Sequence, residues 1–339
     1  MKGIGQKTAA QENGIQETGM QKTAVQETEA QKKDEKDVGD PNPAYEDCLL
    51  ALKRRLEQAD AVVIGAGSGL SAAAGLTYAG RRFEDHFKEF IERYGMRDMY
   101  SAGFYPFPTQ EEKWAYWSRH IYYNRYDMPA AKLYRDLYGM MKDKNHFVLT
   151  TNVDHQFWLA GFQDECIFAT QGDYGLFQCK QACHKKLYDN EAQIRAMLRE
   201  QKDCRIPSRQ VPKCPVCGGD MEVHLRCDGN FVEDEVGYRA GVRYETFLRK
   251  NQEKTLVFLE VGGGMNTPGI IKYPFWRLTK QWKQAFYISV NLEQAWVPDD
   301  IMDRSLVLKA DIAHVLEHLA GTDAGCNDGA GWGEGSCQP

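Results

Sequence analysis

Six short apolar runs constrain the fold of this chain more than any other feature of its sequence. Each run is hydrophobic without polar alternation and ends in a glycine or polar turn, and helical segments lie between several of them. Strands with this composition are buried on both faces, as happens in parallel sheets that helices cover. The runs therefore predict an α/β fold built on a doubly wound, parallel, Rossmann-like sheet. They are DAVVIGAG (60–67), HFVLTTN (146–152), CIFAT (166–170), TLVFLEVGG (255–263), AFYISVN (285–291) and SLVLKA (305–310).

The first run leads into a glycine-rich turn, GAGSGLSAAAGL, and then into a helix that starts with small residues. Gly65, Ala66 and Gly67 occupy the turn, and Ser68 and Ser71 follow them. Glycines let the backbone approach a pyrophosphate, and a helix N-terminus adds N–H groups that favour an anion. Glycine also serves ordinary strand–helix turns, and serines often cap helices. The order of strand, glycine turn and helix favours a dinucleotide-phosphate site over these alternatives.

Polar residues that suit catalysis follow the second run, in the segment LTTNVDHQF. The amide of Asn152 can hold a water or a ribose hydroxyl, and the carboxylate of Asp154 can stabilise a positive charge. A turn in which Asn or Asp caps the next helix explains the same residues equally well. Both interpretations stay open on this segment alone.

Two cysteine pairs form the most specific local pattern in the chain. Cys179 and Cys183 are separated by three residues, and Cys214 and Cys217 form a CPVCG knuckle. Four thiolates in two turns suit a structural zinc ion (Zn²⁺) in a closed tetrahedral site, and free buried thiols are the alternative. The stretch between the pairs is longer than in most zinc ribbons, so another residue could replace one ligand. The candidates for that replacement are His184, Cys204 and Cys227.

The stretch from residue 81 to residue 138 is dense in aromatic and charged residues, for example KWAYWSRHIYYNRYD. This density predicts a helical lobe, inserted at about residues 80–140, whose rings pack together as a core. With a zinc module at about residues 173–230, the lobe belongs to one catalytic domain that spans residues 43–320.

The two ends of the chain predict tails. Glutamine recurs every five residues from Gln6 to Gln31, a period that matches neither an α-helix nor a β-strand. Residues 1–42 therefore present no apolar face to bury, which predicts a disordered tail. Residues 321–339 are rich in glycine and lack periodicity, which predicts a second, flexible tail.

Charge and composition narrow the classes of function. The net charge of −6 and the pI of about 5.8 argue against a nucleic-acid-binding surface. No apolar run approaches the roughly 20 residues of a membrane helix, and the N-terminus lacks the pattern of a signal or transit peptide. Without a secretory signal, the ten cysteines favour thiols and metal ligation over disulfides. We expect a soluble protein of a reducing compartment, most simply the cytoplasm.

The order of these motifs resembles that of the sirtuins, a superfamily of NAD-dependent deacylases and ADP-ribosyltransferases. GAGSGLSAAAGL resembles their first NAD-binding loop, TTNVD their T-Q-N-I-D segment, and the two cysteine pairs their zinc module. GGGMNTP resembles a second loop, usually G-T-S-L-x-V-x-P, and SVNLE resembles their I/V-N-x-E motif. The resemblance covers roughly residues 44–319.

The resemblance implies NAD as a co-substrate and zinc as a structural ion. It implies that the pyrophosphate lies over the two glycine loops and that Asn291 and Asp311 lie near the adenosine. The full set of residues implied to contact NAD is Gly65, Ala66, Gly67, Ser68, Ser71, Asn152, Asp154, Gln171, Gly262, Gly263, Gly264, Asn291, Glu293 and Asp311.

Departures from the sirtuin pattern indicate a subgroup. Gln171-Gly172 stands where sirtuins have a proton-accepting histidine before glycine, a P-D-F-R segment is missing, and Gly263-Gly264 replaces Thr-Ser. This combination is similar to the divergent, macrodomain-linked class M sirtuins, which carry a glutamine at that position. That subgroup transfers ADP-ribose to proteins, and its known acceptors are lipoyl-carrier proteins. The resemblance therefore implies an acceptor protein of this kind and, as a second partner, a macrodomain hydrolase that reverses the transfer.

The glutamine suggests how the chemistry differs. Deacylation requires a base for a ribose hydroxyl, and an amide cannot accept a proton at neutral pH. Transfer to an external nucleophile requires only that the ribose be oriented, which Gln171 can do. The implied catalytic residues are Asn152, Asp154 and Gln171. The alternatives are a deacylase or NAD hydrolase that uses another base such as His155, and a non-catalytic sensor of NAD or ADP-ribose.

Overall fold

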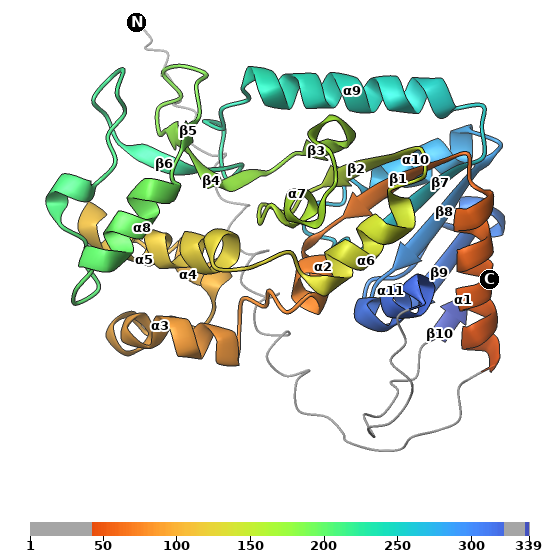
Figure 1. Ribbon diagram of the computed structural model, residues 1–339, viewed down its shortest axis with the longest axis horizontal. Coiled ribbons are helices and arrows are strands. Elements are labelled where there is room, and N and C mark those ends of the chain that lie inside the picture. The colour runs from red at the N-terminus through yellow and green to blue at the C-terminus, as the bar shows by residue number, and fades with distance from the viewer. Residues whose placement is uncertain (1–42, 322–335, 339) are drawn as a thin grey trace, which may run out of the picture. The chain divides into compact units, whose positions relative to one another are not determined.

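The computed structural model describes residues 43–321 and 336–338 (Figure 1). The expected N-terminal tail lies outside the described residues, as does most of the expected C-terminal tail. Within the latter, strand β10 (Ser336–Gln338) pairs antiparallel with β9 (Ser305–Lys309). None of the helices in the described residues is long and apolar enough to span a membrane.

The main sheet has seven strands in the order β10-β9-β8-β7-β1-β2-β3. All pairings between the strands from β9 to β3 are parallel. Numbered along the chain, these strands follow the order 3-2-1-4-5-6 of the doubly wound dinucleotide-binding fold. The six predicted strands and the predicted fold class are therefore confirmed. The strands are β1 (Ala61–Ala66), β2 (His146–Thr150), β3 (Ile167–Ala169), β7 (Leu256–Val261), β8 (Ala285–Val290) and β9 (Ser305–Lys309).

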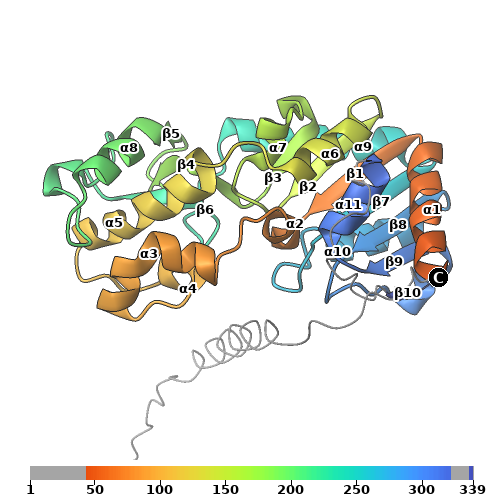
Figure 2. The same ribbon diagram turned by 60° about the horizontal axis from the view of Figure 1, so that its bottom comes forward.

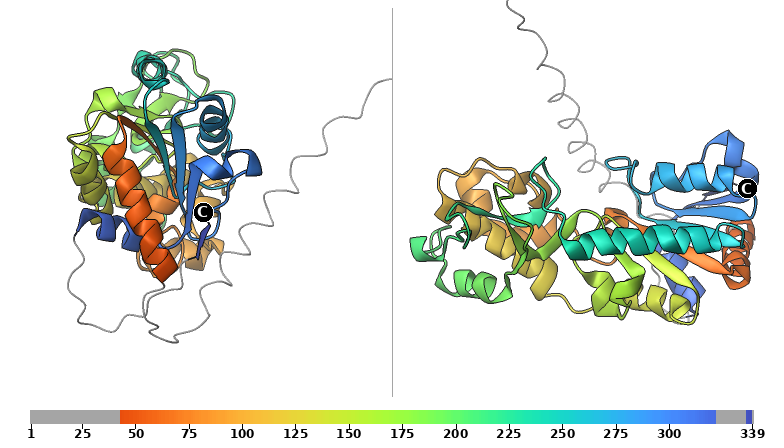
Figure 3. Two further views of the ribbon diagram at one scale, coloured as in Figure 1. Left: turned by 90° about the vertical axis from the view of Figure 1, so that its right-hand side faces the viewer. Right: turned by 90° about the horizontal axis from the view of Figure 1, so that it is seen from above.

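Helices cover both faces of this sheet, as Figures 1 and 3 show. Successive side chains of a strand point to opposite faces, and both faces of β1 are buried. Val62 and Ile64 pack in one hydrophobic core, and Val63 packs in the other. Burial on both faces is the reason why the strands read as unbroken apolar runs. The first core includes α1 (Pro43–Gln58), α6 (Lys132–Met141) and α11 (Ile312–Ala320); the second includes α9 (Glu235–Asn251) and α10 (Lys272–Gln281).

The aromatic-rich helices form another core together with a small antiparallel sheet in the order β5-β4-β6 (Figure 2). Phe87 and Trp114 from the helices pack in this core beside Cys179 and Cys214. The helical lobe and the cysteine-bearing sheet therefore share one hydrophobic core. Their elements are α3 (Arg81–Tyr94), α4 (Met99–Gly103), α5 (Gln110–Ile121), α8 (Glu191–Glu200), β4 (Gly172–Cys179), β5 (Tyr188–Asp189) and β6 (Met221–Leu225).

Helix α6 differs from the sequence-based expectation. It falls within the lobe expected at about residues 80–140, yet Leu133, Tyr134 and Leu137 pack in the core of the parallel sheet. A helical pattern predicts an apolar face without saying which surface that face covers. The remaining short helices are α2 (Ser68–Ala73), the π-helical η1 (Tyr122–Tyr126), α7 (Gln156–Ala160), and the 3₁₀ turns η2 (Asp164–Cys166), η3 (Ser208–Gln210) and η4 (Asp299–Arg304).

Candidate active site and metal centre

The two glycine-rich loops meet at the carboxyl ends of β1 and β7, which are neighbours in the sheet. Gly69 donates a backbone hydrogen bond of 3.0 Å to the carbonyl oxygen of Gly262. A Cβ on Gly67 would lie 2.6 Å from that same oxygen, and a Cβ on Gly262, whose φ is +65°, would collide with the nitrogen of Leu70. These glycines are therefore required for the packing of loop on loop. The loops lie where strand order reverses, which is the usual ligand position in such sheets.

Neither serine of the first loop caps the helix that follows. Helix α2 begins after Gly67, and no side chain accepts a hydrogen bond from its first turn. Ser71 instead donates a hydrogen bond of 2.5 Å to Oδ2 of Asp154. The capping alternative is therefore wrong for these two serines, and Ser71 links the first loop to the segment after β2.

A chain of hydrogen bonds joins Asn152 to Asp154 through two side chains. Nδ2 of Asn152 donates to the hydroxyl of Tyr134 at 3.1 Å, and that hydroxyl lies 2.9 Å from Oγ of Ser71. Because the Ser71 proton is directed at Asp154, Tyr134 must be the donor to Ser71. Nδ2 of Asn152 also donates to the carbonyl oxygen of Gly67 at 3.0 Å. Both amide protons of Asn152 are thus used within the protein, which leaves its Oδ1 as the atom able to accept a hydrogen bond from a ligand.

Asp154 is a buried carboxylate, with 6% of its surface exposed. Burial raises its pKa above the ordinary value, and hydrogen bonds from Ser71 and from the backbone of Gln156 oppose that shift without cancelling it. The nearby charge of Asp173 raises the pKa further. An ionised Asp154 is therefore a poorly solvated negative charge, which favours a positive group placed beside it.

His155, the next residue, is held in an unusual position. Its backbone is left-handed, with a φ of +66°. Its Nδ1 donates to Oδ2 of Asp173 at 2.6 Å, and its ring stacks on Trp158 at 4.4 Å between centroids. Asp173 also accepts hydrogen bonds from Nε of Arg125 at 3.0 Å and from the backbone of Gly175 at 2.6 Å. Burial acts to raise the pKa of Asp173, but His155 and Arg125 lower it below the ordinary value.

Gln171 lies on a loop that runs beside the Asn152–Asp154 segment. The backbone of Thr170 donates to Thr150 and that of Tyr174 donates to Val153, each at 3.0 Å, so the two loops are joined on both sides of Gln171. The Gln171 carbonyl accepts a hydrogen bond from the backbone of Arg226 at 3.0 Å. Its side-chain amide makes no hydrogen bond to any residue within the ranges 43–321 and 336–338. The backbone of Gln171 is fixed, and its amide stays available to a ligand.

The next residue, Gly172, fixes the backbone of this loop. Its φ is +101°, and a Cβ there would collide with the carbonyl oxygen of His224. The Gln-Gly pair is therefore held by backbone packing against β6.

The residues expected near the adenosine make contacts within the protein. Nδ2 of Asn291 donates to the carbonyl of Gly263 at 2.9 Å, and its Oδ1 accepts from the backbone of Glu293 and Gln294 at 3.1 Å each. Asp311 caps helix α11 by accepting from the backbone of Ala313 at 2.7 Å. The side chain of Glu293 is exposed. Asn291 therefore fixes the backbone of the second glycine loop.

A buried ion pair lies directly beneath that loop. Nζ of Lys272 donates to Oε1 of Glu260 at 2.5 Å, and the hydroxyl of Tyr287 donates to Oε2 at 2.7 Å. Glu260 and Lys272 are 0% and 1% exposed. Burial raises the pKa of Glu260, and the charge of Lys272 opposes the shift. A Cβ on Gly263 would lie 2.6 Å from Oε1 of Glu260, so the carboxylate occupies the space that a side chain would need.

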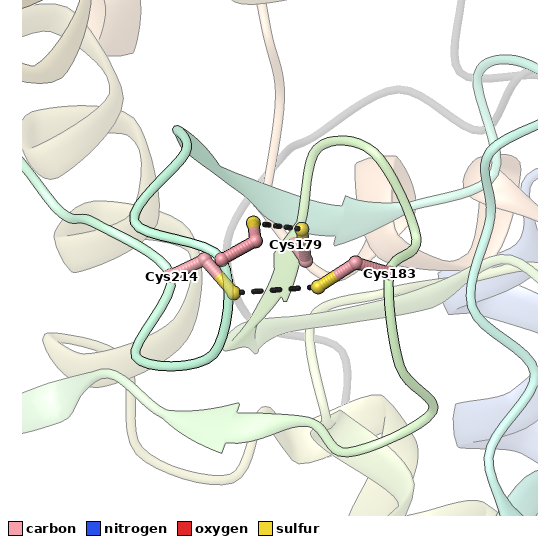
Figure 4. A group of neighbouring side chains, drawn as sticks. Cys179, Cys183 and Cys214 are labelled. Carbon is pink, nitrogen blue, oxygen red and sulfur yellow. Dashed lines mark hydrogen bonds between the residues drawn. The ribbon is translucent and has the colours of Figure 1, made fainter.

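The four predicted cysteine ligands come together in one cluster. Their sulfur atoms all lie within 4.8 Å of one another. Cys179 and Cys217 are 3.7 Å apart, as are Cys183 and Cys214 (Figure 4). Zinc–sulfur bonds of roughly 2.3 Å in a tetrahedron place sulfurs roughly 3.8 Å apart, so the cluster fits a closed zinc site.

Residues weighed as replacement ligands take other positions. His184 lies beside the cluster, with its Nδ1 3.0 Å from the sulfur of Cys183 and its Nε2 2.8 Å from the hydroxyl of Tyr188. Histidine in this arrangement can orient a thiolate ligand without binding the metal. Cys204 is buried and Cys227 is exposed, and neither belongs to the cluster.

Solved structures that align with this chain include Sir2 homologues. A crystal structure of a Sir2 homologue in complex with NAD aligns with a TM-score of 0.55 over 80% of this chain and 93% of the other, at 15% identity. A mutated Sir2 homologue in complex with 2′-O-acetyl ADP ribose aligns with a TM-score of 0.53 over 80% of this chain and 95% of the other, at 16% identity. At these identities the likeness shows the fold alone.

A relative in sequence decides the family. A protein ADP-ribosyltransferase of Staphylococcus aureus (strain Mu50 / ATCC 700699) is 37% identical over 266 residues, which are 78% of this chain and 84% of that protein. This chain belongs to the sirtuin-type protein ADP-ribosyltransferases. A probable bifunctional ADP-ribose hydrolase/ADP-ribosyltransferase of Fusarium oxysporum f. sp. cubense is 32% identical over 66% of this chain and 39% of that protein. No protein-family model matches the chain.

Several contacts around the candidate site of this sirtuin-type chain differ from what its sequence predicts. The sequence predicts only an aromatic core around Tyr134, whereas its hydroxyl joins Asn152 to Ser71. Asp173 binds His155 and Arg125, and the sequence signal for it is an acidic residue two positions after Gln171. Glu260 offered the clearest signal, because a carboxylate inside the run LVFLEV requires a partner if the strand is buried.

Proposed function

We propose that this chain transfers ADP-ribose from NAD to a side chain of an acceptor protein, releases nicotinamide, and uses a lipoyl-carrier protein as acceptor. The observation that supports the proposal most strongly is the uncommitted amide of Gln171, held beside Asn152 and Asp154 by backbone contacts. The family of the chain supports the transfer reaction, and the sirtuin fold supports NAD as its donor. The carrier protein rests on the resemblance to class M sirtuins alone.

In this proposal the pyrophosphate of NAD lies across the two glycine loops. In the first turn of α2 the N–H groups of Gly69 and Leu70 donate to backbone carbonyls, which leaves that of Ser68 for a ligand. Gly262, Gly263 and Gly264 present a backbone without side chains. Such surfaces suit a pyrophosphate, because backbone N–H groups can point at its oxygens. Asn291 contributes by holding Gly263 in place, and Glu293 and Asp311 lie at the ends of neighbouring strands toward the adenosine.

Three side chains act on the nicotinamide ribose. Gln171 orients a ribose hydroxyl through its amide, and Asn152 accepts a hydrogen bond through Oδ1. As the bond to nicotinamide breaks, positive charge develops on the ribose, and the poorly solvated carboxylate of Asp154 stabilises it. Because glutamine cannot accept a proton, Gln171 itself cannot activate a ribose hydroxyl as deacylation requires. Deacylation and simple NAD hydrolysis remain the competing activities to measure.

The four cysteines would hold a zinc ion with no open coordination position, so the metal would supply structure and no chemistry. Cys179 and Cys214 belong to the core of the helical lobe, which links zinc binding to the folding of that lobe. A site of four thiolates requires that these four cysteines stay reduced.

One assay tests the proposal. The protein is incubated with NAD and with the same carrier protein in lipoylated and unlipoylated form, and each carrier is weighed by intact-protein mass spectrometry. We expect one ADP-ribose on the lipoylated carrier and an equal amount of free nicotinamide. If other proteins are modified but neither carrier is, the transferase activity stands and the proposed acceptor is wrong. Release of nicotinamide without any modified protein would identify a hydrolase.

The Fusarium protein, of which this chain covers 39%, is described as a probable bifunctional hydrolase and transferase. By analogy, a macrodomain hydrolase that removes ADP-ribose is a suitable second partner. Adding such a hydrolase to the modified carrier should restore its original mass.

A further inference from the structure

We infer that His155, held by Asp173, is the general base that takes the proton from the acceptor nucleophile. The inference rests on the proposed transfer reaction and adds a residue and a substrate class to it. A base is required if the nucleophile carries a proton, and Gln171 cannot serve as one.

The hydrogen bond to Asp173 sets the chemistry of the imidazole. Nδ1 of His155 lies 2.6 Å from a carboxylate oxygen of Asp173, so Nδ1 carries the proton and donates it. In that tautomer the lone pair is on Nε2, which is the arrangement of a histidine base oriented by a carboxylate. Nε2 makes no hydrogen bond to any of the residues that the structure describes. The His155 side chain is 26% exposed, so an incoming nucleophile can reach the ring.

The carboxylate behind the histidine is itself held on two sides. Arg125, from the π-helical turn η1, donates to Oδ1 of Asp173 at 3.0 Å, and the backbone of Gly175 donates to the same atom at 2.6 Å. This leaves Oδ2 for His155. Trp158 stacks on the imidazole with an angle of 13° between the rings, which fixes the ring plane. Together these contacts hold the imidazole in one orientation before a substrate binds, as a catalytic side chain requires.

The backbone at His155 is also typical of a functional position. A left-handed conformation is uncommon for a residue with a side chain, although histidine adopts it more readily than most. Residues held in such conformations cluster at active sites. Here the conformation lets His155 follow Asp154 directly in sequence while its ring reaches Asp173 on β4.

His155 and Asp173, here called the dyad, lie on the loops that carry the proposed ribose-binding residues. His155 is adjacent to Asp154, and Asp173 is two residues after Gln171. The hydrogen bond between His155 and Asp173 therefore crosses from one loop to the other. The charged groups around the imidazole are Asp173 on β4, Arg125 on η1, Asp154 on its own loop and Asp164, which accepts from Nε1 of Trp158 at 3.1 Å.

The step balances without another reagent. The bond between C1′ of the ribose and the nicotinamide nitrogen breaks, and its electron pair leaves with neutral nicotinamide. The acceptor atom forms the new bond to C1′, and its proton passes to Nε2 of His155 and then to water. A carboxylate acceptor would be ionised at neutral pH and would need no base. The dyad therefore indicates an acceptor with a proton to lose, such as a hydroxyl, thiol or amide.

Matched histidine variants test the inference. Asn tolerates the left-handed backbone and cannot act as a base, so His155→Asn removes the base at small structural cost. We expect transfer to fall roughly 10²–10⁴-fold, the usual range for a general base, while the affinity for NAD changes by less than about twofold. Free imidazole should restore part of the rate. The control is His146→Asn, because His146 lies at the start of β2, where its ring accepts or donates one hydrogen bond, to the carbonyl of Lys144, and contacts Phe162 edge-on.

The pH profile supplies a readout that a structural role would not move. The transfer rates of the parent and of His155→Asn are measured as a function of pH, and the two profiles should differ in shape because only the parent passes the acceptor's proton to His155. Asp173→Asn should keep NAD binding and reduce transfer. If the parent transfers ADP-ribose and His155→Asn matches it in rate and pH profile, the base assignment is overturned. If the parent modifies no protein, the proposed function itself fails, which is a separate outcome.

Discussion

The hydroxyl of Ser71 donates a hydrogen bond of 2.5 Å to the carboxylate of Asp154, and this contact ends a chain that begins at Asn152. The carboxylate is nevertheless poorly solvated, because burial raises its pKa above the ordinary value. The ionised Asp154 therefore favours a positive charge next to it. Without a ligand to supply that charge, it lowers the stability of the folded protein. Residues of this kind often trade stability for function.

This trade predicts opposite effects of Asp154→Asn on activity and stability. Because folding raises the pKa, the ionised carboxylate destabilises the folded state. That cost is absent below the ordinary pKa of about 3.9 and grows as pH rises through the raised value. We expect Asp154→Asn to melt at a higher temperature than the parent at neutral pH, at the same temperature near pH 3, and to lose transfer. Melting curves of the parent and of Asp154→Asn across this pH range test the prediction. An equal melting temperature of the two proteins at neutral pH would contradict it.

A second prediction concerns Gln171→His, which restores the sirtuin histidine. The Gln171 amide has no partner within the described part of the chain, so the substitution breaks no internal hydrogen bond. A base contributes roughly 10²–10⁴-fold only when an acyl-lysine is already held in line. We expect little or no deacylation and weaker transfer, because imidazole cannot reproduce the paired donor and acceptor of an amide. Turnover of an acyl-lysine peptide and ADP-ribose incorporation are measured together, and strong deacylation by the parent would overturn the transferase interpretation.

A third prediction separates NAD contact from loop packing. Gly67 is a poor test of phosphate approach, because a Cβ there would lie 2.6 Å from the carbonyl of Gly262. Gly264 is a better position, since the nearest atom to its Cβ would be Oε1 of Gln294 at 3.7 Å. We expect Gly264→Ala to weaken NAD binding about tenfold, or roughly 1.4 kcal/mol, with an unchanged melting temperature. Calorimetric titration with NAD that gives the parent affinity would remove Gly264 from the phosphate path.

The structural features that could be predicted from the sequence are those determined by residues close together in the chain. Strands buried on both faces must be apolar along their length, so all six parallel strands could be located from composition alone. The cysteine pairs were equally readable, because two turns with close thiols suit one metal. Each strand, like each cysteine pair, can be recognised within a short stretch of the chain.

Tertiary partners could not be read in the same way. A tyrosine on an amphipathic helix such as Tyr134 looks like core, and only the fold shows that its hydroxyl meets Ser71 and Asn152. His155 and Asp173 are 18 positions apart and meet because the segment after β2 runs beside the segment that leads from β3 into β4. The sequence placed Asn291 and Asp311 near the adenosine, and the structure shows that both first stabilise backbone turns.

A fourth prediction concerns removal of the metal. Cys179 and Cys214 pack in the aromatic core of the helical lobe, so losing zinc should loosen that lobe while the parallel sheet stays folded. We expect one zinc per chain by elemental analysis and its loss in Cys179→Ser, with a weakened near-ultraviolet circular dichroism signal. Cys227→Ser is the control, because this exposed cysteine lies outside the cluster. Parent protein that contains no zinc when purified without chelators would refute the site.

The last prediction tests the ion pair beneath the second glycine loop. Removing one partner of a buried pair leaves an uncompensated charge, which typically costs about 3–5 kcal/mol. We expect Lys272→Met to lower the free energy of unfolding by that amount at neutral pH. The decrease should be smaller at acid pH, where Glu260 is protonated. The double variant Lys272→Met/Glu260→Gln removes both charges and should recover most of the loss. Urea denaturation of the three proteins measures these differences. A double variant as unstable as Lys272→Met would show that packing around the lysine stem, and not the unpaired carboxylate, causes the effect.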